Sequence, residues 1–168
     1  MKPTVYWIPG PWRGRLAVVT RPRGHDWLED EIREWRDAGL DSVVSLLEGE
    51  EAEELGLARE QTFAEASGLS YLSFPIPDRG VPGSNAEAVA FLRTIRSEIE
   101  AGKSVAVHCR QGVGRSGLVA AGVLVTAGLR PEEALQRVSA ARGETVPETP
   151  EQRSWVQRLP SAELAVTR

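Results

Sequence analysis

Residues 103–117 read KSVAVHCRQGVGRSG, and this stretch decides the fold that we predict. Its first six residues form a short, largely apolar run, which is typical of a strand buried in the middle of a sheet. From about residue 116 to residue 127 the sequence is apolar almost all round, which predicts a helix that passes through the core. The stretch therefore predicts a buried strand, a tight loop and a buried helix in succession.

Short strands and helices alternate along the rest of the chain, which favours an α/β domain. Further strands are expected at residues 5–8, 16–19, 41–47 and 69–74. Helices are expected from Asp26 to Gly39, between residue 47 and Ala66, from Ser84 to Gly102, from Pro131 and from about Thr149. We predict one domain over residues 1–168, with a central, mostly parallel sheet flanked by helices.

The helices expected from Asp26 and from Ser84 begin with a capping-box pattern, in which the first side chain accepts a hydrogen bond at the helix N-terminus. Asp26 with Glu29 forms one such pattern, and Ser84 with Glu87 forms the other. The apolar face of the first helix is expected to consist of Leu28, Ile32 and Trp35. That of the second is expected to consist of Ala88, Leu92, Ile95 and Ile99.

The composition is that of a globular protein, with 41% hydrophobic and 26% charged residues. A net charge of −4 and a pI near 5.3 argue against a general nucleic-acid-binding protein. The first ten residues lack a cationic segment followed by an apolar run, so we expect a cytoplasmic location without secretion or membrane insertion. The acidic run at residues 48–54 is interpreted as a solvated helix face or loop.

Cys109 is the only cysteine, so the chain cannot form an internal disulfide or a zinc site with several thiolates. We expect no metal and no other cofactor. A single thiol is either a structural core group or a reactive one. Nothing in the sequence specifies an oligomeric state.

The loop that begins at Cys109 combines features that suit a phosphate group. A loop leading into a helix N-terminus directs free backbone N–H groups and the positive end of the helix dipole at one point. Gly112 and Gly114 permit the positive φ and close backbone approach that a tight anion-binding loop requires. The phosphate-binding residues would be Arg110, Gln111, Gly112, Val113, Gly114 and Arg115.

The side chains around this loop suggest nucleophilic chemistry. Cys109 should be a thiolate at neutral pH, because the groups that bind phosphate also stabilise a sulfur anion. Arg115 offers a planar pair of donors for two phosphoryl oxygens. Ser116 can donate a hydrogen bond to the sulfur as it leaves, and His108 would orient the loop rather than act as a base. An inert core thiol is the competing interpretation, but it does not explain this arginine, the two glycines and the strand-to-helix switch together.

With these residues the sequence resembles the cysteine-dependent protein phosphatases, whose signature is His-Cys, five residues, Arg and then Ser or Thr. The order of elements from about residue 26 to 159 is similar to the small dual-specificity branch, particularly the kinase-associated type. Further similarity lies in PIPD at residues 75–78, in GLVAA at residues 117–121, and in Arg142 and Gly143 ahead of Thr149 and Gln152.

The resemblance implies two further site residues. It places Asp78 as the general acid, whereas the residues alone would also allow a turn-forming aspartate after proline. It also implies that Gln152 helps to place the hydrolytic water. The pattern from Thr149 to Gln152 is also a capping box, and of the two roles we slightly favour the helix cap. Asp78 is favoured as the acid over Asp26, Asp30, Asp37 and Asp41, which sit in or beside early elements.

The function that the resemblance implies is metal-independent hydrolysis of phosphotyrosine, and of phosphoserine or phosphothreonine, in a phosphorylated protein partner. A cysteinyl-phosphate would be the intermediate, and neither nucleic acid nor a membrane is expected as a partner. A phosphoinositide is disfavoured by Gln111 and Val113, where such relatives often carry lysines, and an RNA 5′-phosphate by Gly114. Sulfur transfer, arsenate reduction and phosphopeptide binding with little turnover are less favoured functions for such a loop.

Overall fold

The computed structural model describes residues 4–159, which form a five-stranded sheet with helices on both faces. The strands are β1 (Val5–Ile8), β2 (Arg15–Val19), β3 (Ser42–Ser45), β4 (Ser70–Ser73) and β5 (Ser104–His108). Their order is β1-β2-β5-β3-β4; β1 pairs antiparallel with β2 and the other pairs are parallel. The predicted central, mostly parallel sheet is therefore confirmed.

The strand β5 lies at the centre of the sheet, as its sequence predicted. It pairs with β2 on one side and β3 on the other, so that Val107 lies opposite both Val18 and Val44. All five of its residues are buried. Because the parallel strands end at the same edge of the sheet, the loop that follows β5 lies where ligands bind in α/β proteins.

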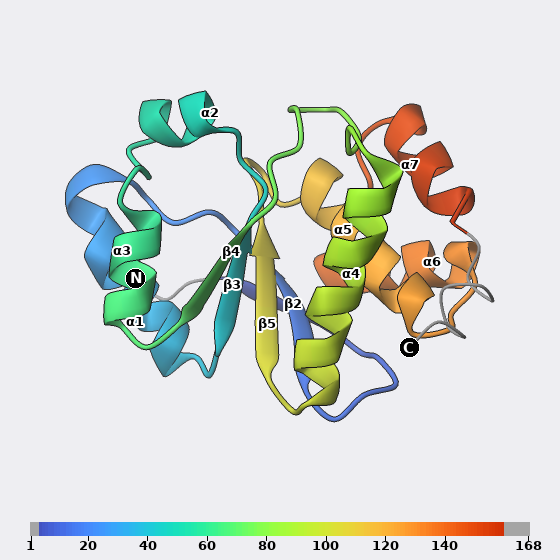
Figure 1. Cartoon of the computed structure of the whole chain (residues 1–168), viewed down its shortest axis with the longest axis horizontal. Helices are drawn as coiled ribbons and strands as arrows, with labels where there is room; N and C mark the ends of the chain where they lie inside the picture. The colour runs from blue at the N-terminus through green and yellow to red at the C-terminus, as the bar shows by residue number, and fades with distance from the viewer. Residues whose placement is uncertain (1–3, 160–168) are drawn as a thin grey trace.

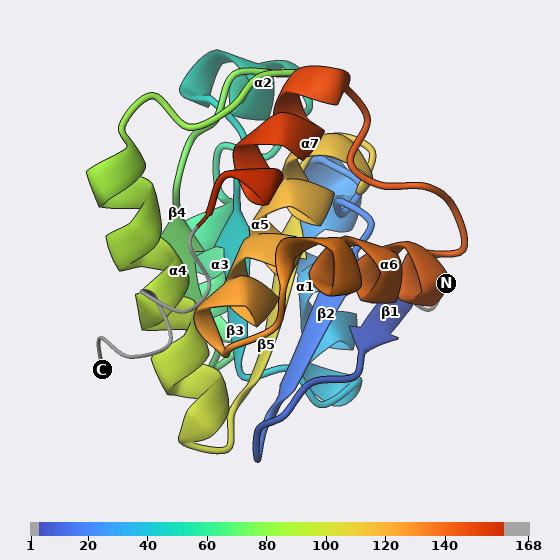
Figure 2. The same cartoon turned by 90° about the vertical axis from the view of Figure 1, so that its right-hand side faces the viewer.

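The helices form two layers, one on each face of the sheet (Figure 1). Their bounds are α1 Leu28–Asp37, α2 Gly49–Glu54, α3 Glu60–Ala66, α4 Asn85–Glu100, α5 Gly114–Thr126, α6 Pro131–Arg142 and α7 Pro150–Gln157. One apolar cluster packs α1 and α3 against the sheet, and a second packs α4, α5, α6 and α7 against its other face. Figure 2 shows α5 enclosed by this second layer.

Every residue of α5 is buried, which confirms the prediction of a core helix. Close packing explains why small residues recur along it. A Cβ on Gly117 would lie 2.8 Å from the Cβ of Val146, and one on Gly122 would lie 2.8 Å from Leu92 Cδ1. The helix can therefore approach its neighbours closely, which holds its N-terminus and the preceding loop in place.

The predicted helix start at Asp26 is wrong, although the rest of the expected helix is confirmed. Residues His25–Trp27 form a short 3-10 turn, and α1 begins at Leu28 without a side-chain cap. A tight turn therefore takes the place of the expected cap. The expected face of Leu28, Ile32 and Trp35 is buried. The helix α4 begins as predicted, with Ser84 Oγ accepting a hydrogen bond from the Glu87 N–H.

Within residues 4–159, no helix has the length and apolar character needed to span a membrane.

Candidate active site

Only one of the two glycines in the loop between β5 and α5 has the positive φ that we predicted. Gly112 has φ +74°, as predicted for a residue that curls the loop. Gly114 does not have a positive φ, so that part of the prediction is wrong; it is the first residue of α5. A Cβ at Gly114 would lie 3.0 Å from Gln152 Oε1, so the absence of a side chain there lets Gln152 approach closely.

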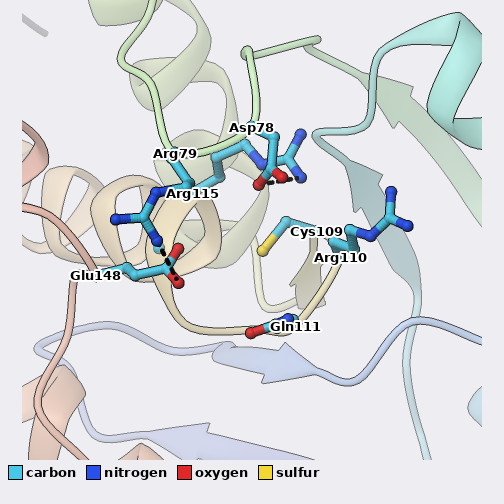
Figure 3. A pocket seen from close by; sticks show the side chains of 8 residues that line it. Asp78, Arg79, Cys109, Arg110, Gln111, Arg115 and Glu148 are labelled. Carbon is cyan, nitrogen blue, oxygen red and sulfur yellow. Dashed lines mark hydrogen bonds and ion pairs between the residues drawn. The ribbon is translucent and has the colours of Figure 1, made fainter.

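A pocket opens above this loop and brings together most of the predicted site residues (Figure 3). Its volume is about 160 Å³, below the roughly 300–1,000 Å³ of sites that enclose a drug-sized ligand. A phosphate group and the atoms next to it therefore fit inside, and the rest of a larger substrate stays outside. The lining residues are Asp78, Arg79, Cys109, Arg110, Gln111, Gly114, Arg115 and Glu148.

Cys109 lies at the base of this pocket and is 3% exposed. Its sulfur faces the space below Asp78 and Arg115, whereas the guanidinium of Arg110 extends away from it (Figure 3). Arg110 Nη1 instead lies 3.7 Å from a carboxylate oxygen of Glu51. The structure thus brings Cys109 and Arg115 to one pocket, as predicted, and assigns the side chain of Arg110 to its wall.

The guanidinium of Arg115 is almost fully enclosed and makes four hydrogen bonds. It donates to both carboxylate oxygens of Glu51 at 2.7 and 2.9 Å, to the carbonyl oxygen of Ile76 at 2.9 Å and to Asp78 Oδ1 at 3.2 Å. Burial alone would lower the pKa of Arg115, but the Glu51 hydrogen bonds and the charges of Cys109, Glu51 and Asp78 leave it raised. Arg115 is therefore held as a fixed cation at the pocket.

Glu51 is a site residue that the sequence interpretation missed. It lies in the acidic run that we assigned to a solvated face, but its side chain is only 13% exposed. Hydrogen bonds from Arg115 lower the pKa of Glu51, against the opposing effect of burial. The run contains several glutamates in a row, so nothing in the sequence distinguishes the one that turns inward.

His108 contacts a second buried carboxylate that the sequence did not reveal. Its Nε2 lies 2.6 Å from Glu60 Oε2, and its Nδ1 lies 3.3 Å from the carbonyl oxygen of Cys109. The two contacts hold the imidazole ring in one place beneath the loop. The role of His108 in orienting the loop stays a prediction.

Asp78 lies at the rim of the pocket, in a turn closed by a 2.8 Å hydrogen bond from the Gly80 N–H to the Pro77 carbonyl oxygen. Its side chain is 54% exposed. The next residue, Arg79, has φ +61° and pairs with Glu148 at 3.0 Å on the surface. The turn thus holds the Asp78 carboxyl group beside Arg115, and its role as general acid stays a prediction.

Ser116 and Gln152 occupy less direct positions. Ser116 Oγ is buried and has no hydrogen-bond partner among the residues that the structure describes, so its contact with the sulfur stays a prediction. Gln152 is fully buried and forms a capping box with Thr149, which confirms the helix-cap interpretation.

Arg142 supports the loop from outside and was not predicted to do so. Its guanidinium donates to the carbonyl oxygens of Gly112 at 2.9 Å and Gln111 at 3.3 Å, and it stacks over the ring of Tyr6 at 4.3 Å. These contacts satisfy two carbonyl groups of the loop and tie it to α6. Among residues 4–159, no three His, Cys, Asp or Glu side chains form a group that could hold a metal ion.

Comparison with known proteins identifies relatives by sequence. The family described as "Polymorphic toxin system, DSP-PTPase phosphatase" matches residues 17–129. The putative tyrosine phosphatase 197R of Invertebrate iridescent virus 6 is 28% identical over 144 residues, covering 83% of this chain and 52% of the relative. The tyrosine-protein phosphatase of Autographa californica nuclear polyhedrosis virus is 31% identical over 96 residues, covering 55% of this chain and 54% of the relative. The chain thus spans about half the length of these two relatives.

Solved structures agree with this result. Kinase associated phosphatase (KAP), with its catalytic-site cysteine replaced by serine, superposes with a TM-score of 0.87 at 18% identity, covering 100% of this chain and 99% of that one. Tk-PTP in its active form has a TM-score of 0.75 at 32% identity and covers 100% of both chains. The fold, the matched family and the identity to Tk-PTP lead to one conclusion: the chain belongs to the DSP-PTPase phosphatases, the small dual-specificity branch of the cysteine-based protein tyrosine phosphatase superfamily.

Proposed function

We propose that this protein hydrolyses phosphate monoesters on proteins, foremost phosphotyrosine, through a cysteinyl-phosphate intermediate on Cys109. The observation that carries the proposal is the meeting of three groups at one small pocket: the Cys109 sulfur, the enclosed cation of Arg115 and the Asp78 carboxyl. Membership of the phosphatase family supports the same reaction.

In the first step the Cys109 thiolate attacks phosphorus, and the bond between phosphorus and the leaving oxygen breaks. Asp78 donates a proton to that oxygen as it departs. The backbone N–H groups of residues 110–115 and the guanidinium of Arg115 bind the other phosphoryl oxygens, whose charge they stabilise through the transition state.

Glu51 contributes by fixing Arg115 before the substrate arrives. Both of its oxygens hold one edge of the guanidinium, so Arg115 need not be ordered during binding. A phosphate that approaches from the pocket competes for the remaining hydrogens, including the one directed at Asp78. Binding therefore releases Asp78 from Arg115 and leaves its carboxyl group facing the leaving oxygen.

In the second step water attacks the cysteinyl-phosphate and the Asp78 carboxylate takes its proton. The bond between sulfur and phosphorus breaks, which returns the thiolate and releases inorganic phosphate. Ser116 donates a hydrogen bond to the sulfur in this step. A reduced Cys109 is needed throughout, so we place the reaction in the cytoplasm, where thiols stay reduced.

The pocket dimensions favour a substrate whose phosphate stands on an extended group. An aryl phosphate projects its phosphorus far from the peptide backbone, and a cavity of about 160 Å³ accepts the phosphate with part of the ring. Phosphoserine and phosphothreonine are shorter, and their phosphate groups also fit a cavity of this volume. Dual specificity toward proteins is therefore part of the proposal.

The test is hydrolysis of p-nitrophenyl phosphate in the presence of a chelator. Cys109→Ser should abolish turnover while phosphate binding persists, because the loop and Arg115 are unchanged. Substantial activity in that variant would contradict the nucleophile assignment. A wild type that binds phosphopeptides without turning over any phosphate ester would instead establish a binding module, and faster hydrolysis of phosphoinositide vesicles than of phosphopeptides would move the substrate to lipids.

A further inference from the structure

The turn that carries Asp78 is anchored at both ends by buried side chains. Ahead of it, the Ile76 carbonyl oxygen accepts a 2.9 Å hydrogen bond from Arg115 Nη1. After it, the Gly80 carbonyl oxygen accepts a 3.0 Å hydrogen bond from Gln152 Nε2. Asp78 lies between these two anchors, so its position depends on both.

The amide of Gln152 can take only one orientation in this setting. Its Oε1 lies 3.1 Å from the backbone N–H groups of both Glu148 and Thr149, which are donors. Its Nε2 faces the carbonyl oxygen of Gly80, which is an acceptor. In a reversed amide, the NH₂ group would face the two backbone N–H groups, and the amide oxygen would face the carbonyl oxygen of Gly80. The orientation that remains links the N-terminus of α7 to the turn of Asp78.

The same amide is buried and fixed against the phosphate-binding loop. Gln152 is 0% exposed, and the position of a Cβ on Gly114 lies 3.0 Å from its Oε1 and 3.1 Å from its Nε2. Both acceptor positions of Oε1 are occupied by backbone donors, and one of the two Nε2 hydrogens is donated to Gly80. With its side chain also fully buried, the amide in this position does not face an attacking water. The contacts of Gln152 are those of a structural link between three segments.

We propose that Gln152 is a positioning residue for Asp78: it holds the turn at residues 77–80 in place and does not place the hydrolytic water. This inference rests on the proposed function, in which Asp78 is the general acid. It assigns Gln152 to the first chemical step, because that is the step in which Asp78 donates its proton to the leaving oxygen.

Substitution of Gln152 should slow a different step for each role, positioning Asp78 or placing the hydrolytic water. A displaced acid slows formation of the cysteinyl-phosphate, and the loss grows as the leaving group becomes more basic. A misplaced water slows hydrolysis of that intermediate, and the loss is the same for every leaving group. In the second case a burst of the leaving alcohol, about equal to the enzyme concentration, precedes steady turnover.

Three variants separate the turn contact from the helix cap. Gln152→Glu keeps an acceptor for the α7 N-terminus but, when ionised, has no hydrogen to donate to Gly80. Gln152→Met removes both contacts without adding charge, which controls for the new carboxylate. Thr149→Ala weakens the cap, where its Oγ1 accepts from the Gln152 N–H at 3.1 Å, and leaves the contact with Gly80 in place.

We would measure the three variants, wild type and Asp78→Asn at neutral pH with p-nitrophenyl phosphate and phenyl phosphate. Both Gln152 variants should lose about tenfold more rate on phenyl phosphate than on p-nitrophenyl phosphate, without a burst, as a weaker form of Asp78→Asn. Thr149→Ala should keep the leaving-group dependence of wild type. A burst in both Gln152 variants, with unchanged leaving-group dependence, would overturn the proposal and restore the water-placing role.

Hydrogen exchange tests the link without relying on catalysis. Peptides covering residues 77–83 should exchange faster in Gln152→Glu and Gln152→Met than in wild type or Thr149→Ala; equal exchange in all four overturns the proposal. The proposed function fails separately, if wild type hydrolyses neither ester or if Asp78→Asn keeps the wild-type leaving-group dependence. In that event the exchange data alone decide whether Gln152 holds the turn.

Discussion

The two sides of the pocket differ in how they use charge. On the side of α2 and α3, two carboxylates lie inside the protein: Glu51 contacts Arg115, and Glu60, which is 2% exposed, contacts His108. On the side of α6 and α7, Glu148 pairs with an exposed arginine at the surface, and the buried contact is made by the neutral amide of Gln152.

This contrast shows what each side has to hold. A buried ion is stable only when an opposite charge or a set of hydrogen bonds replaces water. The first side holds the enclosed Arg115 cation, which we propose binds phosphate, and the Glu51 carboxylate supplies the opposite charge beside it. The second side holds only a backbone carbonyl group, and a neutral amide satisfies it without burying a charge.

The largest effect on stability should come from Glu60→Ala, which tests the buried side. It removes the acceptor of His108 Nε2 from the core, and breaking such a pair lowers the free energy of unfolding by about 3–5 kcal/mol. Glu148→Ala is the matched control and should change it by less than about 1 kcal/mol, because its pair is exposed. Urea denaturation measures the free energy of unfolding of both variants. Similar losses of stability in the two would contradict the distinction between the two sides of the pocket.

A second comparison exchanges arginine for lysine on each side. Arg115→Lys should reduce kcat/KM for p-nitrophenyl phosphate by about 10²–10³-fold, because an ammonium cannot hold Glu51 and two phosphoryl oxygens in one plane. Arg79→Lys should reduce it by less than about threefold, since this side chain is exposed and paired at the rim. If the two variants lose activity equally, the rim takes part in phosphate binding.

The smallest effect concerns the pH dependence of Glu51. Its pKa is lowered in the folded state, so its contribution to stability is present above its ordinary value of 4.5 and is lost as the pH falls through the folded pKa. Glu51→Gln should therefore be less stable than wild type by about 1–3 kcal/mol at pH 7, and the difference should shrink below about pH 4.5. Urea denaturation at several pH values checks this, with Glu148→Gln as control; a difference that is constant with pH would contradict the assignment.

Much of the site could be predicted because it lies within one continuous loop. Cys109, Gly112 and Arg115 are separated by a few residues, so the turn between a strand and a helix fixes their relative positions. The Asp26 cap was predicted from an even shorter pattern and is wrong, because residues His25–Trp27 form a 3-10 turn instead. Local patterns therefore predict well only where the surrounding elements permit a single backbone path.

Sequence patterns alone determined the central strand, the buried helix and the loop between them that carries Cys109 and Arg115, because short-range periodicity and spacing specify them. Only the tertiary structure decided that Glu51 holds Arg115, that Glu60 meets His108 and that Gln152 reaches Gly80. These partners lie 64, 48 and 72 residues apart in the chain. Pairing over such separations depends on how helices dock across the sheet, and the periodicity of one segment carries no information about the segment that it will face.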